Sequence, residues 1–96
     1  MNELERIGAE LLAKDFELTV KATWEEQRQQ LEERVVFLLL NQMEKLMQIL
    51  YKIDVNERKV KDVFAQNDPK LIAPQLTDLI LNRILQKAET RKNFNA

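Results

Sequence analysis

The sequence predicts an all-α fold, a bundle of three or four helices around one long central helix. The 96 residues include one Gly and two Pro, so the residues that build hairpin turns and flexible linkers are almost absent. Hydrophobic residues make up 45% of the chain and charged residues 32%, a balance typical of folded domains. Through most of the chain the apolar residues recur every three or four positions, which is the period of an amphipathic helix. We therefore expect a single helical domain over residues 1–96, because a chain of this size forms one core.

A first helix is predicted over residues 2–18. Glu3 and Glu5 lie in its first turn, where the helix dipole favours acidic side chains. Gly8 destabilises this helix by on the order of 1 kcal/mol relative to Ala unless a neighbour packs closely against it. Residues 16–24 then alternate apolar and polar residues like a strand, but no second alternating segment exists to pair with them. This segment is therefore expected to be an extended link or a continuation of the helix.

The central helix is predicted over residues 24–53. Thr23 and Glu26 have the spacing of a capping box, which predicts where the helix starts. Its C-terminal half, residues 35–53, contains no Gly or Pro. At a rise of about 1.5 Å per residue, the whole helix would be roughly 45 Å long. One broad apolar stripe is expected to face the core; it consists of Val35, Leu38, Leu39, Met43, Leu46, Ile49, Leu50 and Ile53.

Two further helices are predicted over residues 55–66 and 74–92. Asp54 and Glu57 repeat the capping spacing, so Asp54 is expected to cap the third helix. Pro69 suits the first turn of a helix, whereas Pro74 removes an amide and disfavours helical geometry at Ala73. The sequence therefore predicts a short turn before Pro74 and the last helix after it.

The side chains that most enzymes use for acid–base and nucleophilic chemistry are missing, since the chain has no His, no Cys and no Ser. We therefore expect a protein that is not an enzyme, with no catalytic residue, cofactor or metal site. A metal site would have to consist of carboxylates alone, and the dense acidic cluster is better explained as a solvated helix start. That cluster consists of Glu25, Glu26, Glu32 and Glu33.

The composition also favours a cytoplasmic protein without a membrane anchor. A chain without cysteine fits a reducing compartment. The start of the chain lacks the basic and then apolar pattern of a signal peptide. The longest apolar run, residues 35–40, is much shorter than the roughly 20 residues that span a bilayer.

The apolar circumference of the central helix predicts self-association. Some apolar residues of the central helix lie off its core stripe. Further apolar residues of the last helix widen its apolar face, so that the two helices expose more apolar surface than the short helices can cover. We therefore expect a non-enzymatic protein–protein interaction module that forms a homodimer. Tyr51 and Trp24 are expected to be core or interface anchors. The residues expected at the interface between copies are Val36, Phe37, Leu40, Leu81 and Leu85.

An alternative hypothesis concerns the cations near the end of the last helix. Arg83, Lys87 and Arg91 follow one another at intervals of four residues, and Lys92 lies beside them. Aligned cations can bind phosphates, so this stripe suggests a nucleic acid or another anionic partner. The same residues also complement the helix dipole on a solvated face. A net charge of −1 gives no general attraction to nucleic acid, so this hypothesis stays second to self-association.

Two segments carry a resemblance to other proteins. They are LYKIDVNERKV, residues 50–60, and LIAPQLTDLILNRILQKAETR, residues 71–91. They resemble the C-terminal half of short uncharacterised bacterial proteins that are all-helical. The resemblance implies a helical protein of the bacterial cytoplasm and brings no activity with it.

Overall fold

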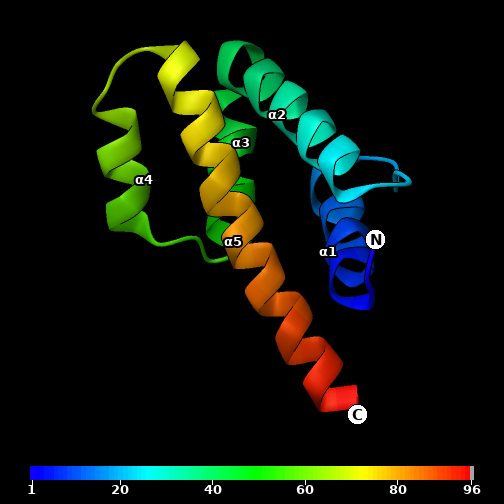
Figure 1. Ribbon diagram of the computed structural model, residues 1–96. Helices are drawn as coiled ribbons and strands as arrows, with labels where there is room; N and C mark the ends of the chain where they lie inside the picture. Colours follow the sequence, from blue (N-terminus) through cyan, green and yellow to red (C-terminus); the bar gives the residue numbers. More distant parts are fainter. Residues whose placement is uncertain (96) are drawn as a thin grey trace.

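The computed structural model describes residues 1–95 and contains five α-helices and no strand within that range. The all-α prediction is confirmed. The structure measures 42 × 26 × 19 Å. Its helices are α1 (Glu3–Phe16), α2 (Trp24–Asn41), α3 (Met43–Lys52), α4 (Glu57–Phe64) and α5 (Pro69–Asn95) (Figure 1).

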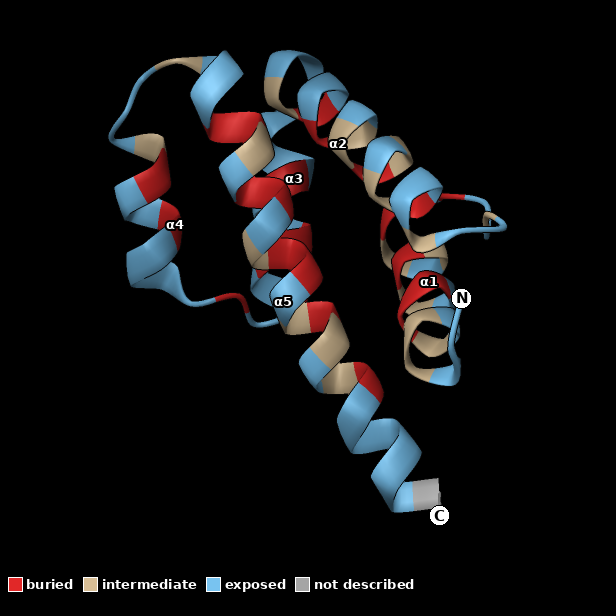
Figure 2. Ribbon diagram, viewed as in Figure 1, coloured by how far each residue is buried: buried red, intermediate tan, exposed pale blue. Residues whose placement is uncertain are grey.

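The helix with the most extensive packing is α5, which contacts α1, α2 and α4. In Figure 1, α1 and α2 lie on one side of α5 and α4 lies on the other. The side chains of Leu76, Ile80 and Ile84 on α5 are completely buried. Residues 89–94 are exposed where α5 extends beyond the other helices (Figure 2). α5 therefore makes the most extensive contacts, while α2, from the segment over residues 24–53, also packs against three helices, α1, α3 and α5.

The predicted helix over residues 24–53 is interrupted at Gln42, where φ is −144° and ψ is 58°. After this residue α3 turns back toward the end of the molecule from which α2 came (Figure 1). Tertiary packing explains this bend, because a straight helix would carry Leu46 and Ile53 away from the core that they share with Leu31. Burial of these residues overrides the local preference for a continuous helix. Met43, which was expected on the core stripe, is instead 42% exposed.

Close packing explains the glycine within α1. A Cβ atom at Gly8 would lie 3.3 Å from the ring of Trp24 on α2 and 3.5 Å from Ile84 on α5. The missing side chain therefore lets α1 approach both helices closely. The start of α1 is fixed by a capping box, in which the Asn2 side chain accepts from the amide of Glu5 at 2.7 Å and the Glu5 side chain accepts from the amide of Asn2 at 3.1 Å.

The connector between α1 and α2 is irregular, not helical, and the buried side chain of Gln27 holds it in place. The amide of Lys21 donates to Gln27 Oε1 at 2.9 Å, and Gln27 Nε2 donates to the carbonyl of Thr19 at 3.1 Å. The predicted start of α2 is confirmed, because the hydroxyl of Thr23 accepts from the amide of Glu26 at 3.1 Å. The connector is therefore bonded to the same helix that it leads into.

Asp54 does not cap the start of α4, so this prediction is wrong. Its φ is 61°, and it is the left-handed residue that ends α3 in a Schellman motif, in which its own amide and that of Val55 donate to carbonyls of the last turn. The cap of α4 is Asn56, whose Oδ1 accepts from the amide of Lys59 at 3.1 Å. Both caps and left-handed positions accept Asp and Asn, so the spacing alone did not separate the two roles.

The last helix is continuous from Pro69 and is not divided at Pro74. Asp68 accepts a hydrogen bond from the amide of Lys70 at 3.0 Å and so caps the helix. Pro74 lies early in the helix, where its missing amide removes one bond to the carbonyl of Lys70. Ala73 is buried at 2% exposure, and this packing outweighs the steric penalty at the residue before a proline.

Among the helices described, none has the combination of length and apolar character that crossing a bilayer requires.

Replacing Gln27 with Leu should lower the free energy of unfolding by about 1–3 kcal/mol, because the amide of Lys21 and the carbonyl of Thr19 lose their buried partner. Urea denaturation of the variant and the wild type measures this change. The control is Gln29→Leu at an exposed position of the same helix, for which we expect a change within about 0.5 kcal/mol. Equal effects of the two substitutions would contradict the role assigned to Gln27.

Candidate interaction surface

Three of the five residues expected at an interface between copies lie on the exposed side of α2. The exposed fractions of Val36, Phe37 and Leu40 are 38%, 46% and 64%. The other two lie on α5. Leu81 is 5% exposed and belongs to the core, so other helices of its own chain already cover it, and Leu85 is half-buried.

A second set of exposed apolar side chains follows one face of α3. Met43, Met47 and Tyr51 are spaced by four residues and are 42%, 43% and 79% exposed. Sequence reasoning placed Met43 in the core and did not recognise this face. The signal in the sequence was that Met43, Met47 and Tyr51 recur every four residues. They form a second apolar stripe beside the one formed by Leu46 and Leu50.

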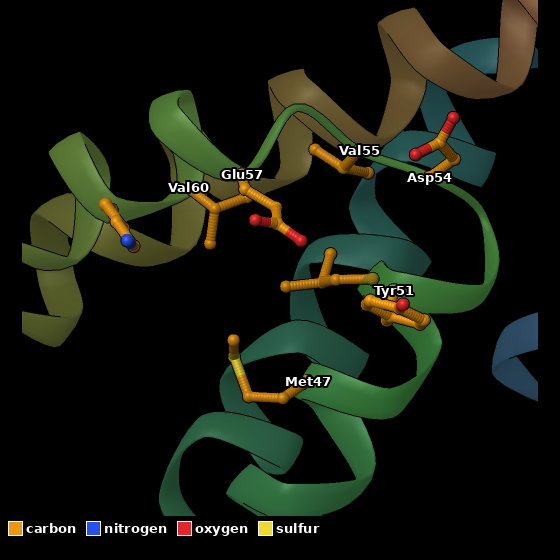
Figure 3. Close-up of a pocket in the computed structure, with 8 residues that line it drawn as sticks. Met47, Tyr51, Asp54, Val55, Glu57 and Val60 are labelled. Carbon is orange, nitrogen blue, oxygen red and sulfur yellow. The ribbon is translucent and has the colours of Figure 1, made fainter.

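Met47 and Tyr51 also form one wall of a groove of about 410 Å³ between α3 and α4. In Figure 3 these two side chains come from α3, while Glu57 and Val60 come from α4. Apart from Met47 and Tyr51, the lining is of two kinds: apolar side chains that are buried, and charged side chains of both signs. An apolar groove of this kind accepts the apolar face of a helix. The buried lining residues are Leu50, Val55 and Val60, and the charged ones are Asp54, Glu57 and Lys61.

Two ion pairs hold α3 to the C-terminal end of α1. Lys45 Nζ lies 2.8 Å from the Glu17 carboxylate, and Lys52 Nζ lies 3.4 Å from the Asp15 carboxylate. The hydrogen bond and the positive charge of Lys45 hold the pKa of the Glu17 carboxyl below its ordinary value, and the charge of Arg34 acts in the same direction. Both lysines therefore lie on the side of α3 that faces α1, away from Met47.

The basic stripe on α5 is only partly available to a ligand. Arg83 Nε donates to the carbonyl of Ile53 at 2.9 Å, so Arg83 stabilises the end of α3. Lys92 Nζ lies 3.9 Å from the Glu3 carboxylate of α1. Lys87 and Arg91 form no ion pair within residues 1–95. A hollow of about 520 Å³ is lined by Arg83, Lys87, Thr90, Arg91 and Phe94.

Two further acidic side chains of the surface contact neighbouring residues of the chain. The Asp78 carboxylate lies 2.6 Å from Arg28 and links α5 to α2. In the acidic cluster at the start of α2, the Glu26 carboxylate accepts from the hydroxyl of Thr23 at 3.1 Å. Among the residues that the structure describes, no group of three or more carboxylates is placed to hold a metal ion.

No protein-family model, curated protein or solved structure matches this chain. The resemblance to short bacterial proteins therefore stays an expectation. The function has to be inferred from the surface, which presents exposed apolar side chains on two consecutive helices and a basic hollow on a third.

The contact between Glu17 and Lys45 predicts a pH dependence. Because the pKa of the Glu17 carboxyl is lower in the folded chain than in the unfolded chain, its contribution to stability is present above the ordinary carboxyl range and is lost as the pH falls through the lowered pKa. An NMR titration of the Glu17 carboxyl should show its midpoint rising toward the ordinary value in Lys45→Met. Lys52→Met, which removes the neighbouring pair with Asp15, should leave the midpoint where it is. A Lys45→Met midpoint equal to that of the wild type would contradict the contact.

Proposed function

We propose that the protein is a non-enzymatic interaction module that self-associates as a homodimer through the exposed apolar side chains of α2 and α3. The observation that carries this proposal is the amount of apolar area that these two helices leave bare. We call the six side chains the α2–α3 surface: Val36, Phe37, Leu40, Met43, Met47 and Tyr51.

The size of the α2–α3 surface supports an interface with another chain. The exposed fractions of its six side chains add up to about three complete side chains, and at about 200 Å² for a fully exposed large side chain this is about 600 Å². The largest apolar patch of a monomer is typically about 300–600 Å². Each partner of a standard interface contributes about 800 Å². The six side chains together expose less area than one partner of a standard interface contributes, so the proposed dimer also has to bury polar residues around them.

The chemistry of this surface fits a second copy of the chain. Around the groove between α3 and α4, Asp54 and Glu57 carry negative charge and Lys61 carries positive charge. A two-fold axis brings the same surface patch together from both copies, so a patch with both signs can place acid against base. Met43 and Met47 are flexible and polarisable, which suits a surface that has to adapt to its own copy.

A charge placed in the α2–α3 surface should weaken the dimer. Light scattering and sedimentation over micromolar concentrations should show the wild type passing from monomer to dimer, and Met47→Lys should raise the dissociation constant at least about tenfold, which is about 1.4 kcal/mol. The matched control is Gln48→Lys, at an exposed polar residue of the same helix, which should change the constant less than about twofold. A wild type that stays monomeric throughout, or equal effects of both variants, would rule out the proposal.

The second candidate function is binding of an anionic partner in the basic hollow of α5. The observation in its favour is that Lys87, Arg91 and Thr90 line the same hollow as Phe94, which is 89% exposed. Two cations, a hydroxyl and an aromatic ring are the groups that bind phosphates and stack on bases. Arg83 is left out of this set because it is bonded to the end of α3.

Reversing the charge of Lys87 and Arg91 together tests this candidate. If the hollow binds anions, fluorescence anisotropy with a labelled single-stranded oligonucleotide should show a weaker affinity and a salt dependence reduced by about one to two phosphate contacts. The control reverses Arg58 and Lys59, two exposed cations of α4. An affinity that is unchanged by the α5 substitutions, or equally weakened by both pairs, excludes the hollow as a specific site.

A further inference from the structure

The C-terminal end of α5 projects from the molecule and carries an aromatic ring that its own chain leaves bare. Residues 89–94 are exposed where α5 extends beyond the other helices (Figure 2), and Phe94 is 89% exposed. A ring of this size gains most from contact with an apolar partner. We call residues 87–94 the α5 end.

The ring and the cations of the α5 end share one face of the helix. Lys87, Thr90, Arg91 and Phe94 follow the i, i+3, i+4, i+7 spacing by which a helix lays one face into a groove of another protein. All four line the same hollow. Lysine and arginine also pack their aliphatic stems on apolar surface while the charge stays in water. This face can therefore contact an apolar groove along its whole length.

The groove between α3 and α4 has the complementary character. Its apolar wall consists of Met47 and Tyr51, which are 43% and 79% exposed. Its charged lining consists of two acids, Asp54 and Glu57, and one base, Lys61. In Figure 3 the carboxylate of Glu57 points from α4 toward α3, and it forms no ion pair within residues 1–95.

The charges of the two surfaces have opposite signs. The α5 end contains three cations, Lys87, Arg91 and Lys92, and one acid, Glu89, so it is net positive. The groove lining, with two acids and one base, is net negative. Complementary charges of this kind fix the orientation of a partner and disfavour wrong ones.

The α5 end of the same chain does not reach this groove. Arg83 donates to the carbonyl of Ile53 at 2.9 Å and lies 3.8 Å from the Asp54 carboxylate, so α5 is held against the end of α3 at this residue. From there α5 continues as one helix, which carries Phe94 about 16 Å farther along the axis. In Figure 1 this end points away from α4. An α5 end that enters the groove therefore comes from a second copy.

We propose that the α5 end of one copy docks in the groove between α3 and α4 of a second copy. The ring of Phe94 packs against Met47 and Tyr51, and the cations of the same face lie beside Glu57. A two-fold axis makes this contact twice, once in each direction, and so closes the dimer. This inference rests on the proposed self-association and names the segment of the second copy that covers α3.

The apolar area fits a contact of this kind. The exposed fractions of Phe94, Met47 and Tyr51 amount to about two complete side chains, which is about 400 Å² at about 200 Å² for a fully exposed large side chain. Each partner of a standard interface contributes about 800 Å², of which about 57% is apolar. The three side chains therefore supply nearly the whole apolar share, and the charged side chains around them supply polar area.

Removing the ring tests the docking. Phe94→Ala leaves the core untouched because the side chain is exposed, and a two-fold dimer loses the ring twice. Sedimentation over micromolar concentrations should therefore show a dissociation constant raised at least about tenfold. The matched control is Asn93→Ala, at the exposed neighbouring residue, which should change the constant less than about twofold.

The outcomes separate this inference from the proposed function. If Met47→Lys weakens the dimer and Phe94→Ala does not, the docking of the α5 end is overturned and self-association through the α2–α3 surface stands. A wild type that never dimerises overturns both.

Mixing two variants tests whether the ring of one copy meets the groove of the other. Phe94→Ala keeps the groove and loses the ring, whereas Met47→Lys keeps the ring and places a charge in the groove. Either variant alone can make neither contact, but a mixed dimer makes one of the two. An equimolar mixture should therefore associate at least about fivefold more tightly than either variant alone. A mixture that is no tighter than both would overturn the docking.

An NMR measurement locates the contact. A spin label on Asn93→Cys is specific because the chain has no other cysteine. Spin-labelled chains are mixed with isotope-labelled wild-type chains, so that any broadening of the observed signals arises between copies. We expect the amides of residues 47–61 to broaden under conditions where the dimer forms. Signals of these residues that stay sharp would overturn the inference.

Discussion

The structure depends on one shared core into which both α2 and α3 place their apolar stripes. Leu31 and Val35 from α2 meet Leu46 and Ile53 from α3 in the same buried cluster. In a chain of 96 residues there is no second core for either stripe, so the segment has to fold back on itself. The bend at Gln42 follows from this requirement and not from any residue that breaks helices. The position of α5 between the other helices follows as well, since it closes the core that the bend creates.

The same requirement decides which apolar side chains remain outside. Folding the segment back buries one stripe on each helix and turns the remaining apolar residues outward. Met47 and Tyr51 then form a wall of the groove beside α4, and Leu40 becomes the most exposed residue of its helix among the large apolar ones. The apolar surface is therefore a consequence of how the core is made and not a separate feature added to it.

Sequence reasoning predicted the features that depend on local chemistry. The all-α class, the cap at Thr23 and the close neighbour needed at Gly8 all follow from composition, spacing and helix propensity. The bend at Gln42 could not be predicted this way, because a continuous helix satisfies every local rule. Asp54 was misassigned because the same residue type suits a cap and a left-handed end. Helical geometry at Pro74 depends on burial, which the sequence does not display.

The candidate surface was predicted on α2 and missed on α3 for the same physical reason. Val36, Phe37 and Leu40 lie off the core stripe of α2 whichever way the chain continues. The exposure of Met43 and the groove beside Met47 exist only after the bend, which rotates α3 relative to the expected helix. Arg83 shows the converse case, since its bond to the end of α3 removes it from a stripe that looked uniform in sequence.

The single core also governs how the molecule opens. Because α2, α3 and α5 contribute to one buried cluster, no helix of the three can separate from the others without exposing the apolar interior. Local opening of one helix is therefore as costly as opening the whole core. Backbone amides on the buried faces of these helices would then exchange with solvent at one common rate, that of global unfolding.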